Sequence, residues 1–211
     1  MNRLTYLLLP FVALAFAGCG PDENEENNDE QADRFERPEE AQAIVTDGQL
    51  DQLVEIGATI YPGSTPPELA GVYDRDSGSV VRADNEASLA LNPCYSIWTV
   101  ETTEEDYIYA TTAEYYDNCS GTIESPATYL AGSDNCFSLY VENNGERDGC
   151  EFRWAQVISG CLENGGISDY QEADLGLEND GSAACQSLVE GGFIPDEGQR
   201  ALVERDFVAG Q

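Results

Sequence analysis

The chain has 211 residues, and its 41 acidic and nine basic residues give a formal net charge of −32. So large a negative charge excludes binding to nucleic-acid backbones, which carry the same sign. The chain contains no histidine, and all nine basic residues are arginine. It therefore lacks Ser-His-Asp triads, Cys-His pairs, the usual zinc ligand sets, Schiff-base lysines and phosphate-binding lysines. Because no motif singles out a pair among the 41 carboxylates, we expect no enzyme, no cofactor and no metal.

The first 18 residues have the pattern of an export signal peptide. A positive start at Arg3 precedes apolar residues 4–18, a stretch shorter than the roughly 20 residues of a membrane-spanning helix. Phe16-Ala17-Gly18-Cys19 resembles the lipobox of bacterial lipoproteins. The resemblance implies cleavage before Cys19, a diacylglycerol on its sulfur, a further acyl chain such as palmitate on the new amine, and stable membrane anchoring. Because Gly20 rather than Asp follows, the resemblance favours the outer over the inner membrane of the cell envelope.

Behind Cys19 the chain divides into a tether, residues 19–40, and one domain, residues 41–211. The segment 20–40 is polar and acidic, which favours disorder. A partial helical stripe of apolar residues then predicts one short N-terminal helix, best defined from Gln49 to Ile56, with Asp47-Gly48 as a candidate break before it.

The middle of the chain predicts a mainly β domain. Short runs rich in Val, Ile, Thr, Tyr and Trp recur at residues 71–73, 79–81, 95–100, 107–116, 122–130, 136–141 and 150–159. Turn residues separate these runs, and Asn144-Gly145 predicts a hairpin. Many short strands at regular spacing favour an antiparallel barrel or sandwich. We expect a short C-terminal helix at 182–192 with Ser182 as its N-cap, and closing strands at 193–195 and 202–208.

A second resemblance favours the barrel over the sandwich. GSTPPELAGVY (63–73), VISG (157–160), GGI (165–167) and FIPDEGQRALV (193–203) are similar to segments of uncharacterised exported lipoproteins with lipocalin-like barrels. The resemblance implies a β-barrel, but it carries over no binding residue.

The cysteines predict disulfides in an exported protein. Six remain beside Cys19, and their positions are Cys94, Cys119, Cys136, Cys150, Cys161 and Cys185. An even count in an oxidising compartment predicts three disulfides, and their pairing stays open among 15 connectivities.

Two kinds of binding site are conceivable from the sequence. Aromatic residues gather in the strand region, at Tyr95, Trp98, Tyr107, Tyr109, Tyr115, Tyr116, Tyr129, Tyr140 and Trp154, where they would either line a pocket for a small apolar ligand or fill the core. Residues 74–79 alternate oxygen-bearing side chains as a calcium loop does, but depart from the EF-hand pattern at Ser79 and Asn85, so a hairpin turn is the competing interpretation.

The sequence therefore predicts a membrane-anchored, non-enzymatic exported lipoprotein, for which binding of a small apolar ligand in a β-barrel is the favoured hypothesis. The alternative is a structural or envelope-partner-binding surface protein without a ligand, or a calcium-binding module. Two explanations for the acidity stay open, adaptation to a saline habitat and an ordinary acidic surface.

Overall fold

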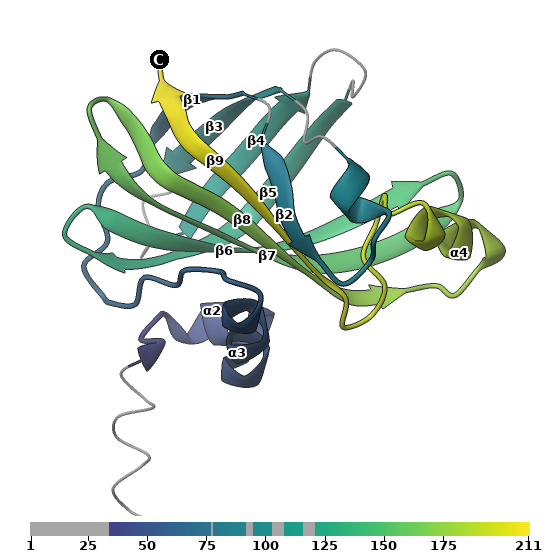
Figure 1. The fold of residues 1–211 in the computed structure, drawn as a ribbon. Coiled ribbons are helices and arrows are strands. Elements are labelled where there is room, and N and C mark those ends of the chain that lie inside the picture. The colour runs from purple at the N-terminus through teal and green to yellow at the C-terminus, as the bar shows by residue number, and fades with distance from the viewer. Residues whose placement is uncertain (1–33, 77, 92–94, 103–107, 116–120) are drawn as a thin grey trace, which may run out of the picture.

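The computed structural model describes residues 34–211 except residue 77 and residues 92–94, 103–107 and 116–120. In this part of the chain nine strands form one sheet in the order β1-β3-β4-β5-β6-β7-β8-β9-β2 (Figure 1), and every pairing is antiparallel. The strands are β1 (Gly71–Arg75), β2 (Ser79–Ala83), β3 (Ser96–Thr102), β4 (Ile108–Tyr115), β5 (Gly121–Ser133), β6 (Cys136–Arg147), β7 (Cys150–Glu163), β8 (Gly166–Asn179) and β9 (Arg200–Gly210). The helices are α2 (Glu39–Ile44), α3 (Asp47–Glu55), α4 (Ala183–Glu190) and the 3-10 turn η1 (Ser88–Ala90). The prediction of a mainly β, antiparallel fold is confirmed, and the sheet is single rather than one of two in a sandwich.

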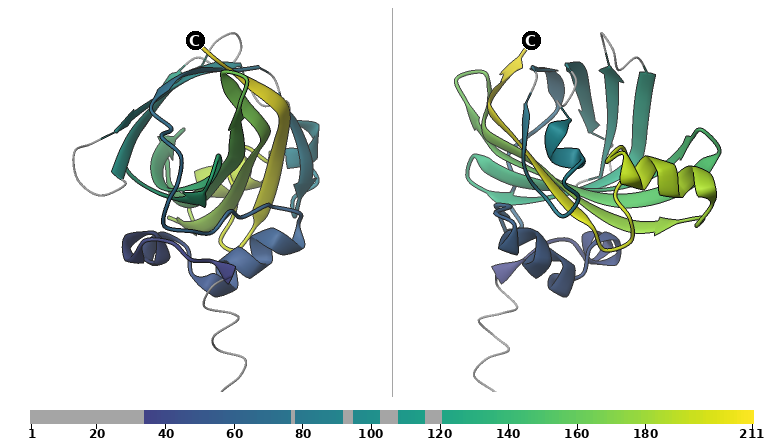
Figure 2. Two further views of the ribbon diagram at one scale, coloured as in Figure 1. Left: turned by 90° about the vertical axis from the view of Figure 1, so that its left-hand side faces the viewer. Right: turned by 45° about the vertical axis from the view of Figure 1, so that its right-hand side comes forward.

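The sheet curls on itself into a barrel-like shape (Figure 2). β1 pairs with β3 along its length and also with β9, through Tyr73–Gly210 and Asp74–Ala209. β2 pairs with the earlier part of β9, between residues 201 and 204. β2 thus pairs with the first part of β9 and β1 with its end. Because β1 pairs with both β3 and β9, it links these two strands.

Tight turns join the long strands β6, β7 and β8. Asp148 and Gly149 connect β6 to β7 with φ values of 53° and 82°, and Asn164 and Gly165 connect β7 to β8 with φ values of 50° and 81°. Two successive residues with positive φ form the type I′ turn, whose twist matches that of the flanking strands. Asp-Gly and Asn-Gly are the dipeptides that adopt this turn most readily.

The predicted turn at Asn144-Gly145 is wrong, because both residues lie within β6. Gly145 pairs with Phe152 across the hairpin, and a Cβ at Gly145 would lie 2.7 Å from the Phe152 ring. The glycine therefore makes room for an aromatic ring instead of turning the chain.

Alternate residues of the central strands face opposite sides of the sheet and build two cores. The inner core, inside the curl, consists of Leu69, Tyr73, Trp98, Val100, Leu130, Phe137, Leu139, Val141, Ile158, Ile167, Tyr170 and Val208. The outer core lies between the sheet and helices α2 and α3, and includes Phe35, Ala41, Ile44, Leu50, Leu53, Tyr140, Ala155, Val157, Ala173, Leu175 and Leu202. Figure 1 shows the two helices on the outside of the curled sheet.

Between residue 35 and the first strand the structure has two short helices, not the single predicted one. The Thr46 hydroxyl accepts a hydrogen bond from the Gln49 N–H at 3.3 Å, and the Thr46 N–H donates to the Gln49 side chain at 2.9 Å. This capping box starts α3 at Asp47, so Asp47-Gly48 lies inside the helix and the break falls before Thr46. The helix expected at 49–56 is confirmed as most of α3.

The segment before α2 is already packed against the rest of the domain, since Phe35 is 6% exposed and Arg37 is 7% exposed. The Arg37 guanidinium donates to the carbonyl oxygens of Phe35 at 2.9 Å and Val45 at 2.7 Å. It also lies 2.8 Å from the carboxylate of Asp47. One buried side chain thus holds together the segment before α2, the α2–α3 junction and the start of α3.

The C-terminal region agrees in part with the sequence. The predicted helix is confirmed as α4, with the Ser182 hydroxyl accepting from the Cys185 N–H at 3.2 Å and Gly191 as its C-cap. The strand expected at 202–208 is part of β9, whereas residues 193–195 form no strand. There Ile194 is 3% exposed because it packs with α4 against Cys150 and Cys185.

Among the helices that the structure describes, none is both long enough and apolar enough to cross a membrane.

Candidate functional site

A buried ionic cluster of Arg75, Glu172 and Arg205 lies inside the curled sheet. The same Glu172 oxygen, Oε1, is 3.3 Å from Arg75 Nη1 and 3.1 Å from Arg205 Nη2. The three residues are 3%, 9% and 9% exposed. A single carboxylate therefore bridges two buried guanidinium groups, which strongly disfavours leaving any one of the three charges alone.

Strand register and aromatic rings position this ionic cluster. Arg75 on β1 is paired with Ser96 on β3, and its Nε donates to the Ser96 hydroxyl at 3.0 Å. Its Nη1 also contacts the Tyr170 hydroxyl at 3.1 Å, and its guanidinium lies 5.5 Å from the centre of the Trp98 ring. The Arg205 guanidinium lies 5.8 Å from the Tyr170 ring. Cation–π contacts of this kind favour the charged form of buried arginine.

The protonation of Glu172 follows from these neighbours. Burial alone would raise the pKa of Glu172, but the charges of Arg75 and Arg205 outweigh it and hold that pKa below its ordinary value. Glu172 is therefore ionised at neutral pH.

Next to the ionic cluster, Asn143, Trp154, Gln156 and Asp174 form what we call the polar inner patch. Gln156 on β7 is paired with Asp174 on β8, and its side-chain amide donates to Asp174 Oδ1 at 2.9 Å. Trp154 stands two residues before Gln156 on the same face of β7 and is paired with Asn143 on β6. Asp174 likewise stands two residues after Glu172 on β8, so the patch continues the inner wall of the sheet.

Asp174 differs from Glu172 in its surroundings. Burial, and then the charge of Glu172, raise the pKa of Asp174 to about 7, although the Gln156 amide and Arg75 act in the opposite direction. Within the part of the chain that the structure describes, Asp174 Oδ2 accepts no hydrogen bond. Two carboxylates two residues apart on one strand thus have pKa values moved in opposite directions.

The polar inner patch borders on space within the curl. Trp154, Gln156 and Asp174 are only half-buried, whereas their outward-facing neighbours Ala155, Val157, Ala173 and Leu175 are 0–1% exposed. The exposure of the patch must therefore come from the inner side of the sheet. On β8 the next inward-facing position is Gly176, and the backbone of Asp196 covers it. A Cβ at Gly176 would lie only 1.9 Å from the Asp196 carbonyl oxygen, so no side chain fits there.

The aromatic residues do not line one common pocket. Trp98 fills the inner core at 2% exposure, and Tyr140 fills the outer core at 0%. Tyr129 packs against the outer core, and the Tyr95 hydroxyl donates to Asp74 Oδ1 at 3.0 Å. Of the remaining predicted aromatics, Tyr107 and Tyr116 lie outside the described residues, and only the backbone of Tyr109 and Tyr115 is described. Trp154 alone, among those with a described side chain, belongs to the polar inner patch.

In the candidate calcium loop at 74–79, several described groups contact other parts of the chain. Asp74 Oδ1 accepts hydrogen bonds from the Tyr95 hydroxyl and from the Gln211 amide at 2.7 Å. The side chain of Arg75 turns inward to the ionic cluster, and the Asp76 carbonyl accepts from Arg205. Ser77 lies outside the described residues.

Four of the six predicted cysteines form two disulfides, Cys136–Cys161 and Cys150–Cys185. The first joins directly paired residues of β6 and β7, and the second ties the start of β7 to α4. Cys19, Cys94 and Cys119 lie outside the described residues. The third disulfide therefore stays a prediction.

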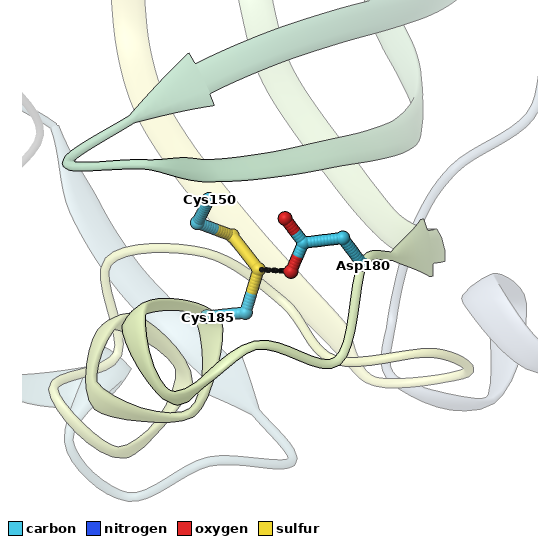
Figure 3. Close-up of side chains that lie close together, drawn as sticks. All are labelled: Cys150, Asp180 and Cys185. Carbon is cyan, nitrogen blue, oxygen red and sulfur yellow. Dashed lines mark hydrogen bonds between the residues drawn. A yellow bond between two sulfur atoms is a disulfide. The ribbon is translucent and has the colours of Figure 1, made fainter.

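An acidic side chain lies against the Cys150–Cys185 disulfide (Figure 3). Asp180 Oδ1 is 2.9 Å from Cys185 Sγ. A disulfide sulfur has no hydrogen to donate, so this is a close contact and becomes a hydrogen bond only in the reduced protein. The two sulfurs and one carboxylate oxygen of Asp180 lie within 4.8 Å of one another, as the ligands of one metal ion would. The sulfurs are joined in a disulfide, however, and so offer no thiolate to a metal. The carboxylate is held by the Ser182 N–H at 2.8 Å and the Glu151 N–H at 3.2 Å.

Among the hollows on the described part of the surface are two open ones, of about 420 and 350 Å³. The first lies at the ends of β6, β7 and β8 around Phe152 and Arg153, and the second lies where β1 meets the β7–β8 turn and the C-terminus. Neither is lined by Asp174 or by the ionic cluster. Of the side chains that the structure describes, three large apolar ones are also exposed, Leu89 at 46%, Phe193 at 50% and Phe207 at 44%.

The sequence analysis missed the ionic cluster and Asp174 because it did not predict β8. The signal was present as alternation, with Ala173 and Leu175 on one face of the strand and Glu172 and Asp174 on the other. Polar residues on the inner face made this segment resemble a loop.

The fold and its interior define a class, a barrel-like antiparallel β protein with ionisable side chains on its inner wall. No protein-family model matches the chain, and neither a curated protein nor a solved structure gives a match. The function is therefore argued from the chain itself.

Proposed function

We propose that the protein is an exported, lipid-anchored, non-enzymatic binding protein that holds a small molecule inside its curled sheet. Its barrel is of the lipocalin-like kind, and it is anchored at the outer membrane. The observation that carries the binding role is the polar inner patch, where Trp154, Gln156 and Asp174 face the interior yet are only half-buried. The adjoining inner core is filled by its own apolar side chains, so the ligand lies beside this core, with an apolar part packed against it and a polar part that contacts the patch.

Lipid attachment to Cys19 is tested on the full chain expressed in its bacterial envelope. A Cys19→Ala variant is expected to leave the membrane fraction and to incorporate no fatty-acid label. The matched control, Gly20→Ala, keeps the sulfur and is expected to remain in the membrane with its label. Labelled, membrane-bound Cys19→Ala protein contradicts the anchor.

The thiol count gives an independent check of the same proposal. With Cys136, Cys161, Cys150 and Cys185 paired, a lipidated Cys19 leaves Cys94 and Cys119 as the third disulfide. Denatured, non-reduced protein is then expected to show no free thiol, and one free thiol per chain contradicts either the lipid or the third disulfide.

Ligand binding is tested with the two tryptophans of the chain. Protein purified from membranes in mild detergent is extracted and examined by native mass spectrometry for a bound molecule. Adding that molecule back is expected to quench the fluorescence of Trp154, which borders the interior space, more than that of buried Trp98. Trp98→Phe and Trp154→Phe variants separate the two signals. A protein that carries no molecule and shows no quenching contradicts the binding role.

A second candidate is an envelope-partner-binding surface protein without a ligand. Leu89 and Phe193 favour it, because they are large exposed apolar side chains on segments that contact each other, with the Ser88 hydroxyl donating to the Gly192 carbonyl at 3.3 Å. Large apolar groups that lie together on a surface mark interaction sites. Cross-linking in intact membranes that captures one partner, together with an interior free of ligand, supports this candidate over the first.

A further inference from the structure

Asp174 combines three features that point to the chemistry of a ligand. It faces the interior of the curled sheet, it is only half-buried, and one of its carboxylate oxygens accepts no hydrogen bond from the residues that the structure describes. Because Oδ2 accepts no hydrogen bond within the described part of the protein, it is open to accept one from a ligand group that enters from the interior side.

The charges around Asp174 select the sign of that donor. Its nearest charged neighbour along β8 is Glu172, whose effect on Asp174 exceeds the opposite effect of Arg75. Arg75 and Arg205 are both engaged by Glu172, at 3.3 and 3.1 Å. At Asp174 the effect of Glu172 thus outweighs that of Arg75, and the net charge of −32 adds a long-range field that also favours a cation. A positively charged donor fits this position, and an anionic ligand does not.

An aromatic face completes the site. Trp154 is paired with Gly176 and Gln156 with Asp174, so Trp154 and Asp174 are diagonal neighbours on the inner face, roughly 7–8 Å apart at the backbone and within reach of long side chains. The Trp154 ring stacks on Phe152 with ring centres 5.3 Å apart, which fixes its orientation. An indole ring beside a carboxylate attracts an ammonium group through the cation–π interaction.

We propose that Asp174, Trp154 and Gln156 bind the ammonium group of a small organic amine, with Asp174 as the counter-ion, Trp154 as the aromatic wall and Gln156 as the residue that positions the carboxylate. This assignment rests on the proposed ligand-binding function and names its ligand class. The apolar part of the amine lies toward the inner core, and the ammonium group donates to Asp174 Oδ2.

The test compares three probes of equal size on the full chain in detergent: butylammonium, 1-butanol and butyrate. Titration calorimetry, with Trp154 fluorescence as a second readout, is expected to give an affinity for butylammonium at least tenfold higher than for the other two. The Asp174→Asn variant keeps the size and the Gln156 contact, and is expected to lower butylammonium affinity about tenfold while leaving 1-butanol unchanged. Trp154→Leu is expected to lower butylammonium affinity several-fold.

Glu204→Gln provides the matched control, because Glu204 is an exposed carboxylate on β9 that accepts a hydrogen bond from the Gln171 side-chain amide at 3.0 Å. It removes one negative charge without touching the interior, and is expected to keep the wild-type affinity. Circular dichroism melting of each variant confirms that it is folded before its affinity is compared.

Three results overturn the assignment: equal affinity for butyrate or butanol, wild-type butylammonium affinity in Asp174→Asn, or no butylammonium binding at millimolar concentration. A co-purified ligand without a basic nitrogen also overturns it, but leaves the proposed binding function intact. An interior that binds no molecule of any charge removes both.

Discussion

Replacing Glu172 by glutamine tests the ionic cluster most directly. Glutamine keeps the shape but removes the one negative charge that both Arg75 and Arg205 contact, at 3.3 and 3.1 Å. Two buried guanidinium groups then face each other without a counter-ion, and breaking a buried pair in this way costs about 3–5 kcal/mol. Since domains are stabilised by roughly 5–15 kcal/mol in total, we expect the melting temperature to fall by about 10 °C or more.

The assay is thermal and urea unfolding of the full chain in detergent, followed by circular dichroism at pH 7. The matched control, Glu204→Gln, is exposed and is expected to change stability by less than about 0.5 kcal/mol. The double variant Glu172→Gln with Arg205→Gln removes one charge of each sign, and is expected to be more stable than the sum of the single losses by about 1–3 kcal/mol.

Acidification provides a further readout of the same residue. The folded-state pKa of Glu172 is lowered, so its contribution is present above its ordinary pKa of 4.5 and is lost as the pH falls below that value. The difference in the free energy of unfolding between wild type and Glu172→Gln should therefore shrink toward pH 3. A Glu172→Gln protein within 1 kcal/mol of wild type at pH 7, or a gap that stays constant with pH, refutes the reasoning.

Three other predictions concern titration, reduction and salt. Because burial raises the pKa of Asp174 from 3.8 to about 7, the native state binds a proton that the unfolded state has lost, and wild-type stability should fall between about pH 4 and pH 7 and then level off. Asp174→Asn should remove this fall, worth at most roughly 4 kcal/mol, and a pH profile equal to that of wild type contradicts it. Asp180→Asn removes the negative charge beside Cys185, so the dithiothreitol thiolate should reduce Cys150–Cys185 several-fold faster than in wild type. The rates are measured by alkylation and mass spectrometry, with Cys136–Cys161 as the internal control. Equal rates for Cys150–Cys185 in the variant and in wild type refute this role of Asp180. Finally, if the acidity is an adaptation to salt, the melting temperature should rise from low salt to 1 M salt, and a constant value favours an ordinary acidic surface.

The elements of the fold that local patterns specify were predictable. The N-cap of α4 at Ser182 and most of α3 follow from capping and periodicity, and the β-rich middle follows from residue type. The continuation of β6 through Asn144-Gly145 was not predictable. Asn-Gly is a strong hairpin signal, but whether the chain turns there depends on the residues that pack opposite it. Here Phe152 packs over Gly145, a tertiary contact that no local pattern contains.

The site was less predictable than the fold, because its residues are far apart in the sequence. Arg75 meets Glu172 across 97 positions and Arg205 meets Glu172 across 33. These contacts depend on the curl of the whole sheet and on the register of β8 against β9. The alternation of β8 itself could have been recognised, but its inner face of Glu172 and Asp174 is polar where a buried strand usually carries apolar residues.

The two disulfides are interleaved along the chain, in the order Cys136, Cys150, Cys161 and Cys185, with bonds spanning 25 and 35 positions. A chain that emerges N-terminus first presents Cys136 and Cys150 before their native partners, and the shorter loop between them closes more readily. That bond is incompatible with β6 and β7 in register, since Cys136 and Cys150 stand at opposite ends of the hairpin ladder. If the Cys136–Cys150 bond forms first, thiol–disulfide exchange has to undo it before the native pairs can form, and a host cell without a disulfide isomerase is then expected to accumulate the mispaired isomer.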